Sequence, residues 1–494
     1  MIPECEAGEH KTNTITMTDN TKVQFLKKTK IIATISNDNC EPDFLESLYW
    51  AGMNGVRLNT AHQTPEEALV VIKKIRAVSD RIAILIDTKG PEIRTTESDG
   101  DVLVKTGDTL IVKGAKDEKM SSECICVSYN DITNDVSVGN MLLIDDGEVE
   151  LEVIVNKGDH LICEVKNDGV IKGRKSVNIP SVKINLPSLS PKDKEFIRFA
   201  AKQDVDFIAH SFVRSKEDVL AVQKILDEEN SPIGIIAKIE NSEGIDNFDQ
   251  ILDHCYGIMV ARGDLAIEVP AEQIPLLQKG LVQKCIERRK PVIIATQMLQ
   301  SMIDSPRPTR AEVSDVANAC FDGTDAIMLS GETATGKYPL EAVQMMAKIA
   351  WEIGQGHETF IDAPYETSQI VTSYLAKAAI KASLRLQTKA IVADSISGRT
   401  IRSMAAYRGK SPIFAQCYSR RVVRQLALSY GIVPHFIEED FTSHEFLKIT
   451  LSRLLKEGRF GDDDLITVLA GHFGPESGAS FIEISSARNM LKRR

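Results

Sequence analysis

The chain has 494 residues, a length that at roughly 150 residues per domain predicts about three domains. Its 59 lysines and arginines against 70 aspartates and glutamates give a net charge of −11, which opposes binding to nucleic acid. Hydrophobic residues make up 43% of the chain, but no apolar run reaches the roughly 18 residues of a membrane-spanning helix. The nine cysteines contain no C-x-x-C pair, so we expect reduced thiols in a cytoplasmic protein, without disulfides or a zinc site.

Eight short apolar runs occur in two parts of the chain, residues 28–89 and 190–355. The runs are residues 30–36, 55–60, 81–89, 206–213, 233–241, 257–265, 291–298 and 326–332. They are continuously apolar, which is typical of parallel strands buried on both faces. Helical stretches separate them, and Ser190-Pro191 predicts the start of one, with a capping serine and a proline at the first helical position. Eight repeats of strand and helix predict a closed (β/α)8 TIM barrel.

The segment between the third and fourth runs has a different period. Hydrophobic residues alternate with glutamates from Val149 to Val155, and Lys157-Gly158-Asp159 then turns the chain back into a second apolar run. This alternation predicts antiparallel strands. We therefore expect a small β-barrel over residues 90–186, inserted as a lid at the mouth of the catalytic barrel, which comprises residues 1–89 and 187–355.

A third domain is predicted over residues 356–494. A helical stretch from Ile370 to Leu386 precedes four apolar runs, KAIVAD, SPIFAQC, GIVPHFI and DLITVLAG. Strands alternating with helices in this order predict an α/β domain with an open sheet. The predicted fold class of the whole chain is therefore α/β.

Charged and polar residues collect at the carboxyl ends of the predicted barrel strands, where barrel enzymes build their active sites. They are Arg57, Asn59, Asp87, Lys89, Ser211, Lys238, Glu240, Asp264, Thr296, Ser330 and Glu332. Any one of these residues, taken alone, is explained equally well as a helix cap or as part of a structural ion pair. Burying the whole set without a function would cost several kcal/mol per unpaired ion, so we interpret the set as an active site.

The residue types at these strand ends indicate which metal ion and which substrate group the site can bind. Glu240 and Asp264 are oxygen ligands on neighbouring strands, and with water and substrate oxygens they suit Mg²⁺. No histidine or cysteine joins them, which argues against zinc. Arg57, Arg94 and Lys238 are cations suited to a phosphoryl group, whose transfer depends on positioning and charge neutralisation. The pattern predicts a site that handles phosphate.

One segment imitates a nucleotide-binding P-loop. Gly331 to Lys337 reads GETATGK and follows a predicted strand. The next residue is Tyr338, where a P-loop has the serine or threonine that binds Mg²⁺, and the segment follows the last strand of a barrel. We therefore expect no P-loop site here.

Seven segments in chain order closely resemble the signature segments of the pyruvate kinase family. They are GMNGVRLNTAH, IDTKGPEIR, IIAKIENSEGIDNFDQIL, IMVARGDLAIEVP, PVIIATQML, PTRAEVSDVANA and IMLSGETATGKYP. The resemblance covers most of the chain and implies transfer of the phosphoryl group of phosphoenolpyruvate to ADP, which gives pyruvate and ATP. It also implies dependence on Mg²⁺ or Mn²⁺, activation by K⁺, allosteric regulation and assembly as a homotetramer.

The resemblance also implies roles for individual residues. Lys238 corresponds to the lysine that neutralises the moving phosphoryl group and the developing enolate, and Glu240 and Asp264 correspond to the Mg²⁺ ligands. Arg57 and Arg94 match phosphate-binding arginines. Further residues match the proton relay (Thr296, Ser330, Glu332), the backbone site for the substrate carboxylate (Gly263, Asp264) and the nucleotide contacts (His62, Lys175, Asp146).

The monovalent cation site departs from the family pattern. Asn59, Asp87 and Thr88 match the usual K⁺ ligands, and Glu92 matches the glutamate of K⁺-dependent members. The usual serine ligand, however, is Ala61. We expect K⁺ still to activate the enzyme, with weaker binding because one oxygen ligand is missing.

A loop of the C-terminal domain resembles the family's effector phosphate-binding loop. It comprises Ser395, Ser397, Gly398, Arg399 and Thr400, between a predicted strand and a helix. Hydroxyls and backbone N–H groups at the start of a helix suit an anion, although an ordinary helix cap has the same composition. The resemblance implies a sugar-phosphate or nucleotide effector.

Two other functions fit parts of the sequence. A Mg²⁺-dependent barrel enzyme of the aldolase kind would share the carboxylates, but it needs neither the lid nor the nucleotide contact predicted for Lys175. A non-catalytic binding barrel predicts loss of Lys238, Glu240 or Asp264, and all three are present.

Overall fold

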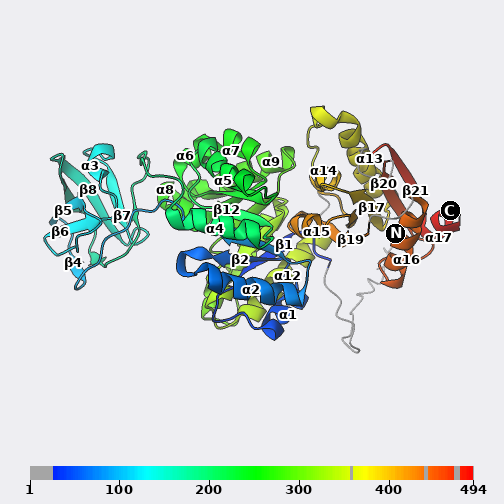
Figure 1. The fold of residues 1–494 in the computed structure, drawn as a ribbon, viewed down its shortest axis with the longest axis horizontal. Helices are drawn as coiled ribbons and strands as arrows, with labels where there is room; N and C mark the ends of the chain where they lie inside the picture. The colour runs from blue at the N-terminus through cyan, green and yellow to red at the C-terminus, as the bar shows by residue number, and fades with distance from the viewer. Residues whose placement is uncertain (1–25, 357–359, 439–442, 472–478, 493–494) are drawn as a thin grey trace, which may run out of the picture.

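The computed structural model describes residues 26–356, 360–438, 443–471 and 479–492. Three bodies follow one another along the molecule, with the inserted domain at one end, the barrel in the middle and the C-terminal domain at the other end (Figure 1). Eight parallel strands close the barrel in the order β1-β16-β15-β14-β13-β12-β3-β2. The predicted (β/α)8 barrel is confirmed.

Each of the eight predicted runs contains one barrel strand. The strands are β1 (Lys30–Thr34), β2 (Gly55–Asn59), β3 (Ala83–Asp87), β12 (Phe207–His210), β13 (Gly234–Ile239), β14 (Gly257–Ala261), β15 (Val292–Ala295) and β16 (Ala326–Leu329). The helices and 3₁₀ turns around them are α1 (Pro42–Ala51), η1 (Thr60–His62), α2 (Pro65–Val78), α4 (Pro191–Lys202), α5 (Lys216–Glu228), α6 (Ser242–Asp246), α7 (Phe248–His254), α8 (Arg262–Glu268), η2 (Ala271–Gln273), α9 (Ile274–Glu287), η3 (Gln300–Ile303), α10 (Arg310–Phe321), α11 (Gly331–Ala334) and α12 (Pro339–Gly356).

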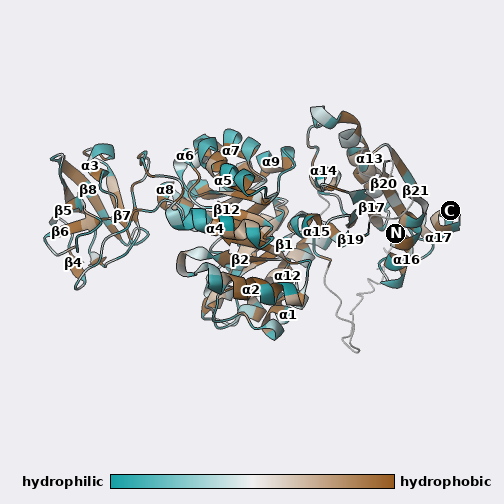
Figure 2. Cartoon of the chain, in the orientation of Figure 1, coloured by the Kyte–Doolittle hydropathy of each residue, from teal (hydrophilic) through white to brown (hydrophobic). Residues whose placement is uncertain are grey.

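The barrel strands are buried on both faces, as their unbroken apolar runs predict. Leu85 and Met259 pack inside the barrel, whereas Ile84 and Ile258 on the same strands pack outward against the helices. Leu428 of the C-terminal domain joins the interior cluster and covers one end of the barrel. Figure 2 shows the result, with hydrophobic strands inside and hydrophilic outer faces on the surrounding helices.

Local sequence signals set the helix starts. The Ser190 hydroxyl accepts the N–H of Asp193 and Pro191 opens α4, as predicted. The same reciprocal capping box begins α2 at Thr64 and α10 at Thr309. Each box satisfies backbone N–H groups that have no partner inside the helix, and so it defines where the helix begins.

The inserted domain is built from antiparallel hairpins and one parallel strand pair. Its elements are β4 (Val102–Val104), β5 (Thr109–Gly114), β6 (Cys124–Val127), α3 (Ile132–Asp135), β7 (Met141–Ile144), β8 (Val149–Asn156), β9 (Leu161–Val165), β10 (Gly169–Ile171) and β11 (Val177–Asn178). Six strands pair in the order β11-β7-β8-β9-β5-β6, and β4 pairs with β10. Residues 93–96 bond to both edges, since Val177 N–H reaches the Ile93 carbonyl and Thr96 N–H reaches the Cys126 carbonyl. This segment joins the two edges in the manner of the predicted small β-barrel.

The C-terminal domain has an open five-stranded sheet in the order β19-β18-β17-β20-β21. Its elements are η4 (Thr367–Gln369), α13 (Ile370–Leu386), β17 (Ala390–Ser395), α14 (Arg399–Ala405), β18 (Ile413–Cys417), α15 (Arg420–Leu426), β19 (Ile432–Phe436), α16 (Ser443–Lys456), β20 (Leu465–Ala470), β21 (Phe481–Ser486) and α17 (Ala487–Lys492). The sequence predicted α13 and the first four strands. It did not predict β21, an edge strand antiparallel to β20.

All eight cysteines in the described part of the chain are free thiols. Across the same residues, no helix combines the length and the apolar composition that crossing a bilayer requires.

Buried ion pairs join the C-terminal domain to the barrel. Arg408 is 2% exposed, and its guanidinium lies 2.7 Å from the Asp325 carboxylate, which precedes β16. Arg424 pairs with the fully buried Asp206 over 2.6 Å in the same interface. Both aspartates immediately precede barrel strands, so these pairs hold the C-terminal domain at the amino ends of the strands.

We predict that Arg408→Met lowers the melting temperature by about 5 to 15 °C, because the Asp325 carboxylate stays buried without its cation. Arg421→Met is the matched control, since its partner Asp204 is more than half exposed and such pairs contribute less than about 1 kcal/mol. Calorimetry of both variants tests this. An equal shift for the two variants would contradict the assigned importance of the buried pair.

Candidate active site

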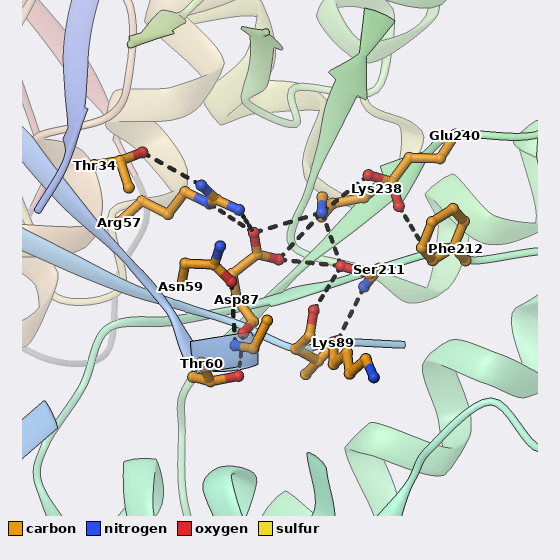
Figure 3. A network of polar contacts seen from close by, with 12 residues as sticks. Thr34, Arg57, Asn59, Thr60, Asp87, Lys89, Ser211, Phe212, Lys238 and Glu240 are labelled. Carbon is orange, nitrogen blue, oxygen red and sulfur yellow. Dashed lines mark hydrogen bonds and ion pairs between the residues drawn. The ribbon is translucent and has the colours of Figure 1, made fainter. Parts of the chain in front are cut away.

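A cluster of charges lies where β2, β3, β12 and β13 end, and its centre is the Asp87 carboxylate (Figure 3). Arg57 Nε donates to Asp87 Oδ2 over 2.6 Å. Lys238 Nζ lies 3.2 Å from Asp87 Oδ1 on the other side. Asp87 is 1% exposed, so both cations are held in a largely desolvated setting.

The Lys238 ammonium has three anionic or polar acceptors. Besides Asp87, its Nζ lies 2.9 Å from Glu240 Oε1 and donates to Ser211 Oγ over 2.8 Å. An ammonium has three N–H donors, so this set satisfies Lys238 and orients its Nζ. Ser211 is itself oriented, because its hydroxyl also lies 2.7 Å from the Thr88 carbonyl.

The paired charges stabilise one another against burial. Burial alone would raise the pKa of Asp87, but Arg57 and Lys238 outweigh it and hold this pKa below its usual value. Burial alone would lower the pKa of Lys238, but Asp87 and Glu240 outweigh it and raise this pKa. Both groups are therefore ionised at neutral pH.

Glu240 and Asp264 carry more negative charge than the nearby cations compensate. Burial and repulsion from Asp264 raise the pKa of Glu240 to about 7, against the opposing effect of Lys238. Burial also raises the pKa of Asp264, and Asp146 and Asp87 add to the effect. A carboxylate pair under this repulsion fits a divalent cation. Among the described residues, no group of three or more histidine, cysteine or acidic side chains is arranged to hold a metal ion.

Thr296 has a strained backbone, with a φ of 66° that a β-branched residue rarely adopts. Its hydroxyl donates to the Ala295 carbonyl over 2.6 Å and accepts the N–H of Gly263 over 2.7 Å. The structure thus joins the end of β15 to the first turn of α8, which carries Gly263 and Asp264. Strain of this kind collects at functional sites.

Glu332 and Ser330 lie together at the end of β16. The Glu332 carboxylate accepts the N–H groups of Leu299 and Ser330, over 3.1 and 2.7 Å. The Ser330 hydroxyl is buried and has no hydrogen-bond partner in the described part of the chain. Glu332 therefore fixes the two strand ends, while the Ser330 hydroxyl retains its hydrogen-bonding capacity.

The predicted nucleotide contacts of the lid bond mainly to the lid itself. Lys175 Nζ lies 2.9 Å from an Asp145 oxygen, and the Asp146 carboxylate accepts the Ser176 hydroxyl over 2.8 Å. Arg94 pairs with Glu92 over 2.7 Å. Asp146 and Glu92 nevertheless both raise the pKa of Asp264, which places the lid within electrostatic reach of the barrel site. The His62 side chain lies outside what the structure describes, although its backbone belongs to η1.

The predicted K⁺ ligands lie around the same strand ends. Asn59 Oδ1 accepts the Ala61 N–H over 3.2 Å, and the Thr60 hydroxyl donates to the Asp87 carbonyl over 2.7 Å. The Thr88 carbonyl accepts the Ser211 hydroxyl. One network therefore connects these oxygens to the Lys238 acceptors.

The predicted effector residues do not join the barrel site. They follow β17 in the C-terminal domain, where the Ser395 hydroxyl accepts the Gly398 N–H over 2.9 Å. Gly398 has a φ of 74°, a left-handed conformation that suits glycine. The lid and this loop lie in the two outer bodies of Figure 1, with the barrel between them.

Sequence reasoning missed two residues of this region. His210 is fully buried beside the site, and its Nδ1 lies 3.2 Å from the Thr88 hydroxyl. Burial lowers the pKa of His210 to about 4, so its ring is neutral at pH 7. Glu268, at the end of α8, accepts backbone N–H groups of Ser242 and Ser181, and burial raises its pKa to about 7. The position of His210 inside an apolar run was a sequence signal that could have identified it. No sequence signal identified Glu268.

Two family models match the chain, one for the pyruvate kinase barrel domain over residues 26–343 and one for the pyruvate kinase alpha/beta domain over residues 373–485. The chain is 46% identical over 474 residues to a pyruvate kinase of Borreliella burgdorferi, which covers 95% of this chain and 99% of that one. The chain belongs to the pyruvate kinase family. Its identity to the pyruvate kinase of Geobacillus stearothermophilus is 43%, over 92% of this chain and 79% of that one.

A crystal structure of a pyruvate kinase from Cryptosporidium parvum has the same architecture. The TM-score is 0.88 at 34% sequence identity, and the alignment covers 94% of this chain and 96% of that one. The chain is accordingly a phosphotransferase that moves the phosphoryl group of phosphoenolpyruvate to ADP and yields pyruvate and ATP.

We predict that Ser211→Ala lowers kcat about tenfold, because Lys238 loses the acceptor that orients its Nζ. Ser211→Thr keeps the hydroxyl and serves as the control. Steady-state pyruvate formation and the melting temperature are measured for both variants. Wild-type kcat in Ser211→Ala would show that the two carboxylates orient Lys238 without the hydroxyl.

Proposed function

We propose that Lys238 is the residue that neutralises the phosphoryl group in transit and the enolate oxygen that it leaves behind. The observation that carries this proposal is the position of its ammonium, held by Asp87, Glu240 and Ser211 at the carboxyl ends of the barrel strands. A cation fixed before the reaction stabilises developing charge without reorganising. Arg57, oriented by the same Asp87, supplies a second cation for the phosphoryl oxygens.

Glu240 and Asp264 are the residues proposed to hold Mg²⁺ or Mn²⁺. Burial raises the pKa of both groups and each adds to the negative charge near the other, although Lys238 opposes the effect, which supports a divalent cation between them. When bound, such an ion polarises phosphoryl oxygens and offsets their charge. Arg94, Lys175 and Asp146 are proposed to contact the nucleotide from the lid, and His62 is proposed to contact it from the barrel, where it belongs to η1.

Thr296 and Gly263 form the proposed site for the substrate carboxylate and the enolate. The Gly263 N–H and the Thr296 hydroxyl lie side by side, and an incoming carboxylate would replace their present acceptors, Thr296 Oγ1 and the Ala295 carbonyl. Ser330, with its unpartnered hydroxyl, is proposed to belong to the proton relay that converts the enolate into pyruvate, and Glu332 to orient it.

Two further parts of the proposal concern regulation. Ser395, Ser397, Gly398, Arg399 and Thr400 are proposed to bind the phosphate of a sugar-phosphate or nucleotide effector. A homotetramer is supported by apolar side chains exposed on α13, namely Ile370, Val371 and Tyr374.

We predict that Lys238→Met reduces turnover at least about a hundredfold, since it removes a preorganised cation from the transition state. Pyruvate formation from phosphoenolpyruvate, ADP and Mg²⁺ is followed, with the exposed Lys337→Met as the matched control. The circular dichroism spectrum confirms that the variant folds. Retained activity in a folded Lys238→Met enzyme would refute the proposed role.

We also predict that K⁺ activates the enzyme but binds weakly, and that Ala61→Ser lowers the half-saturating K⁺ concentration about threefold or more, because a serine adds an oxygen ligand. Ala61→Gly adds none and serves as the control. Turnover is measured against K⁺ concentration at constant ionic strength. Unchanged turnover when a bulky organic cation replaces K⁺ would contradict K⁺ activation altogether.

A further inference from the structure

A second layer of polar groups lies behind the charged cluster, on the outer side of the barrel strands. Ala209 of β12 packs inside the barrel. Successive side chains of a strand point to opposite faces, so the next residue, His210, points outward toward the surrounding helices. Its ring lies within electrostatic reach of Asp218 on α5 and Asp193 on α4, as expected for a side chain between the strands and the helices.

The His210 ring bonds to a pair of residues at the edge of the active site. His210 is fully buried, and its Nδ1 lies 3.2 Å from the Thr88 hydroxyl. The same hydroxyl accepts the Ser211 N–H over 3.0 Å. The Ser211 hydroxyl in turn donates to the Thr88 carbonyl over 2.7 Å. Thr88 and Ser211 therefore form a closed pair, in which the side chain of each residue bonds to the backbone of the other.

Two groups of the active site depend on where this pair lies. The Ser211 hydroxyl accepts the Lys238 ammonium over 2.8 Å (Figure 3). The Thr88 carbonyl belongs to the expected K⁺ ligands. Two bonds on the Thr88 hydroxyl select one of its staggered rotamers, and a rotation of this side chain would release the Ser211 N–H and shift both groups.

Packing alone does not account for a histidine at this position. The Nε2 atom of His210 is buried and has no hydrogen-bond partner in the described part of the chain. A buried polar atom without a partner destabilises the folded state. Leucine has a similar volume and no such atom, so stability alone favours an apolar side chain here. The remaining reason for the imidazole is its bond to Thr88.

We propose that His210 is a positioning residue of the phosphoryl-transfer reaction, which acts through Thr88 and Ser211. Its Nδ1 fixes the Thr88 hydroxyl, and the Thr88–Ser211 pair then holds the acceptor of the Lys238 ammonium and one ligand of K⁺. In this role His210 needs no contact with substrate or metal. The proposal rests on the functions proposed above for Lys238 and for the K⁺ ligands.

His210→Leu in the full chain tests the proposal, because leucine fills a similar volume without a ring nitrogen. Pyruvate formation is followed over a series of K⁺ concentrations. We expect kcat about threefold to tenfold lower and the half-saturating K⁺ concentration about threefold higher, since Lys238 and the Thr88 carbonyl are held less firmly. The KM for phosphoenolpyruvate at saturating K⁺ should change less than about twofold, because the groups proposed to bind its carboxylate lie on α8 and at the end of β15.

The melting temperature separates this role from a packing role. It should stay within about 3 °C of the wild-type value in His210→Leu, because the unpartnered nitrogen is lost together with the bond to Thr88. Wild-type kcat and wild-type K⁺ response in folded His210→Leu would overturn the proposal.

Two further variants serve as controls. His210→Asn keeps an amide near the position of Nδ1 and should restore kcat and the K⁺ response to within about twofold of the wild type. His254→Leu removes an exposed histidine at the end of α7 and should behave as the wild type does. Equal losses of kcat in His210→Leu and His210→Asn, with melting temperatures lower by more than about 8 °C in both, would indicate packing alone and overturn the proposal.

A double-mutant cycle tests the route through Ser211. If His210 acts on Lys238 through the Ser211 hydroxyl, His210→Leu should lower kcat less than about 1.5-fold once Ser211 is already replaced by alanine. Losses of kcat that multiply in His210→Leu/Ser211→Ala would overturn this route. These results are distinct from a failure of the function proposed for Lys238, which appears as retained turnover in Lys238→Met.

Discussion

The charge balance at the carboxyl ends of the barrel strands governs the chemistry of this protein. Two cations, Arg57 and Lys238, lie beside two buried acidic side chains, Asp87 and Glu240, and the partly buried Asp264 is a third acidic group of the site. Asp87 is the anion to which both cations bond, and it stays ionised because of them. The cations Arg57 and Lys238 do not fully balance the negative charges of Glu240 and Asp264. Burial and the repulsion among these carboxylates raise their pKa values, and a divalent cation would offset that repulsion.

The two ends of the barrel face different domains. Its carboxyl end carries the excess of carboxylates and faces the lid, whose Asp146 and Glu92 reach Asp264. Its amino end is joined to the C-terminal domain by buried ion pairs such as Arg408–Asp325.

Much of this architecture could be predicted from local patterns. The eight barrel strands fall inside the predicted runs, because a strand buried on both faces must be continuously apolar. Ser190 and Pro191 predicted where α4 begins. The serine hydroxyl accepts one of the N–H groups that a helix start leaves unpaired, and the proline has no N–H group to leave unpaired. Strand β21 was missed because it is a half-exposed edge strand, whose sequence need not be strongly apolar.

The sequence predicted which residues form the site, but not which of them bond to one another. Carboxyl ends of parallel strands meet at one edge, so the sequence by itself determined that Arg57, Asp87, Lys238 and Glu240 would lie together, and the family signature determined the reaction. Only the tertiary structure decided which carboxylate pairs with which cation, that His210 lies beside Thr88, and that Arg408 pairs with Asp325 across a domain boundary. Those outcomes depend on distances between residues far apart in the chain and on exclusion of water. Neither quantity is contained in a local pattern of residue types.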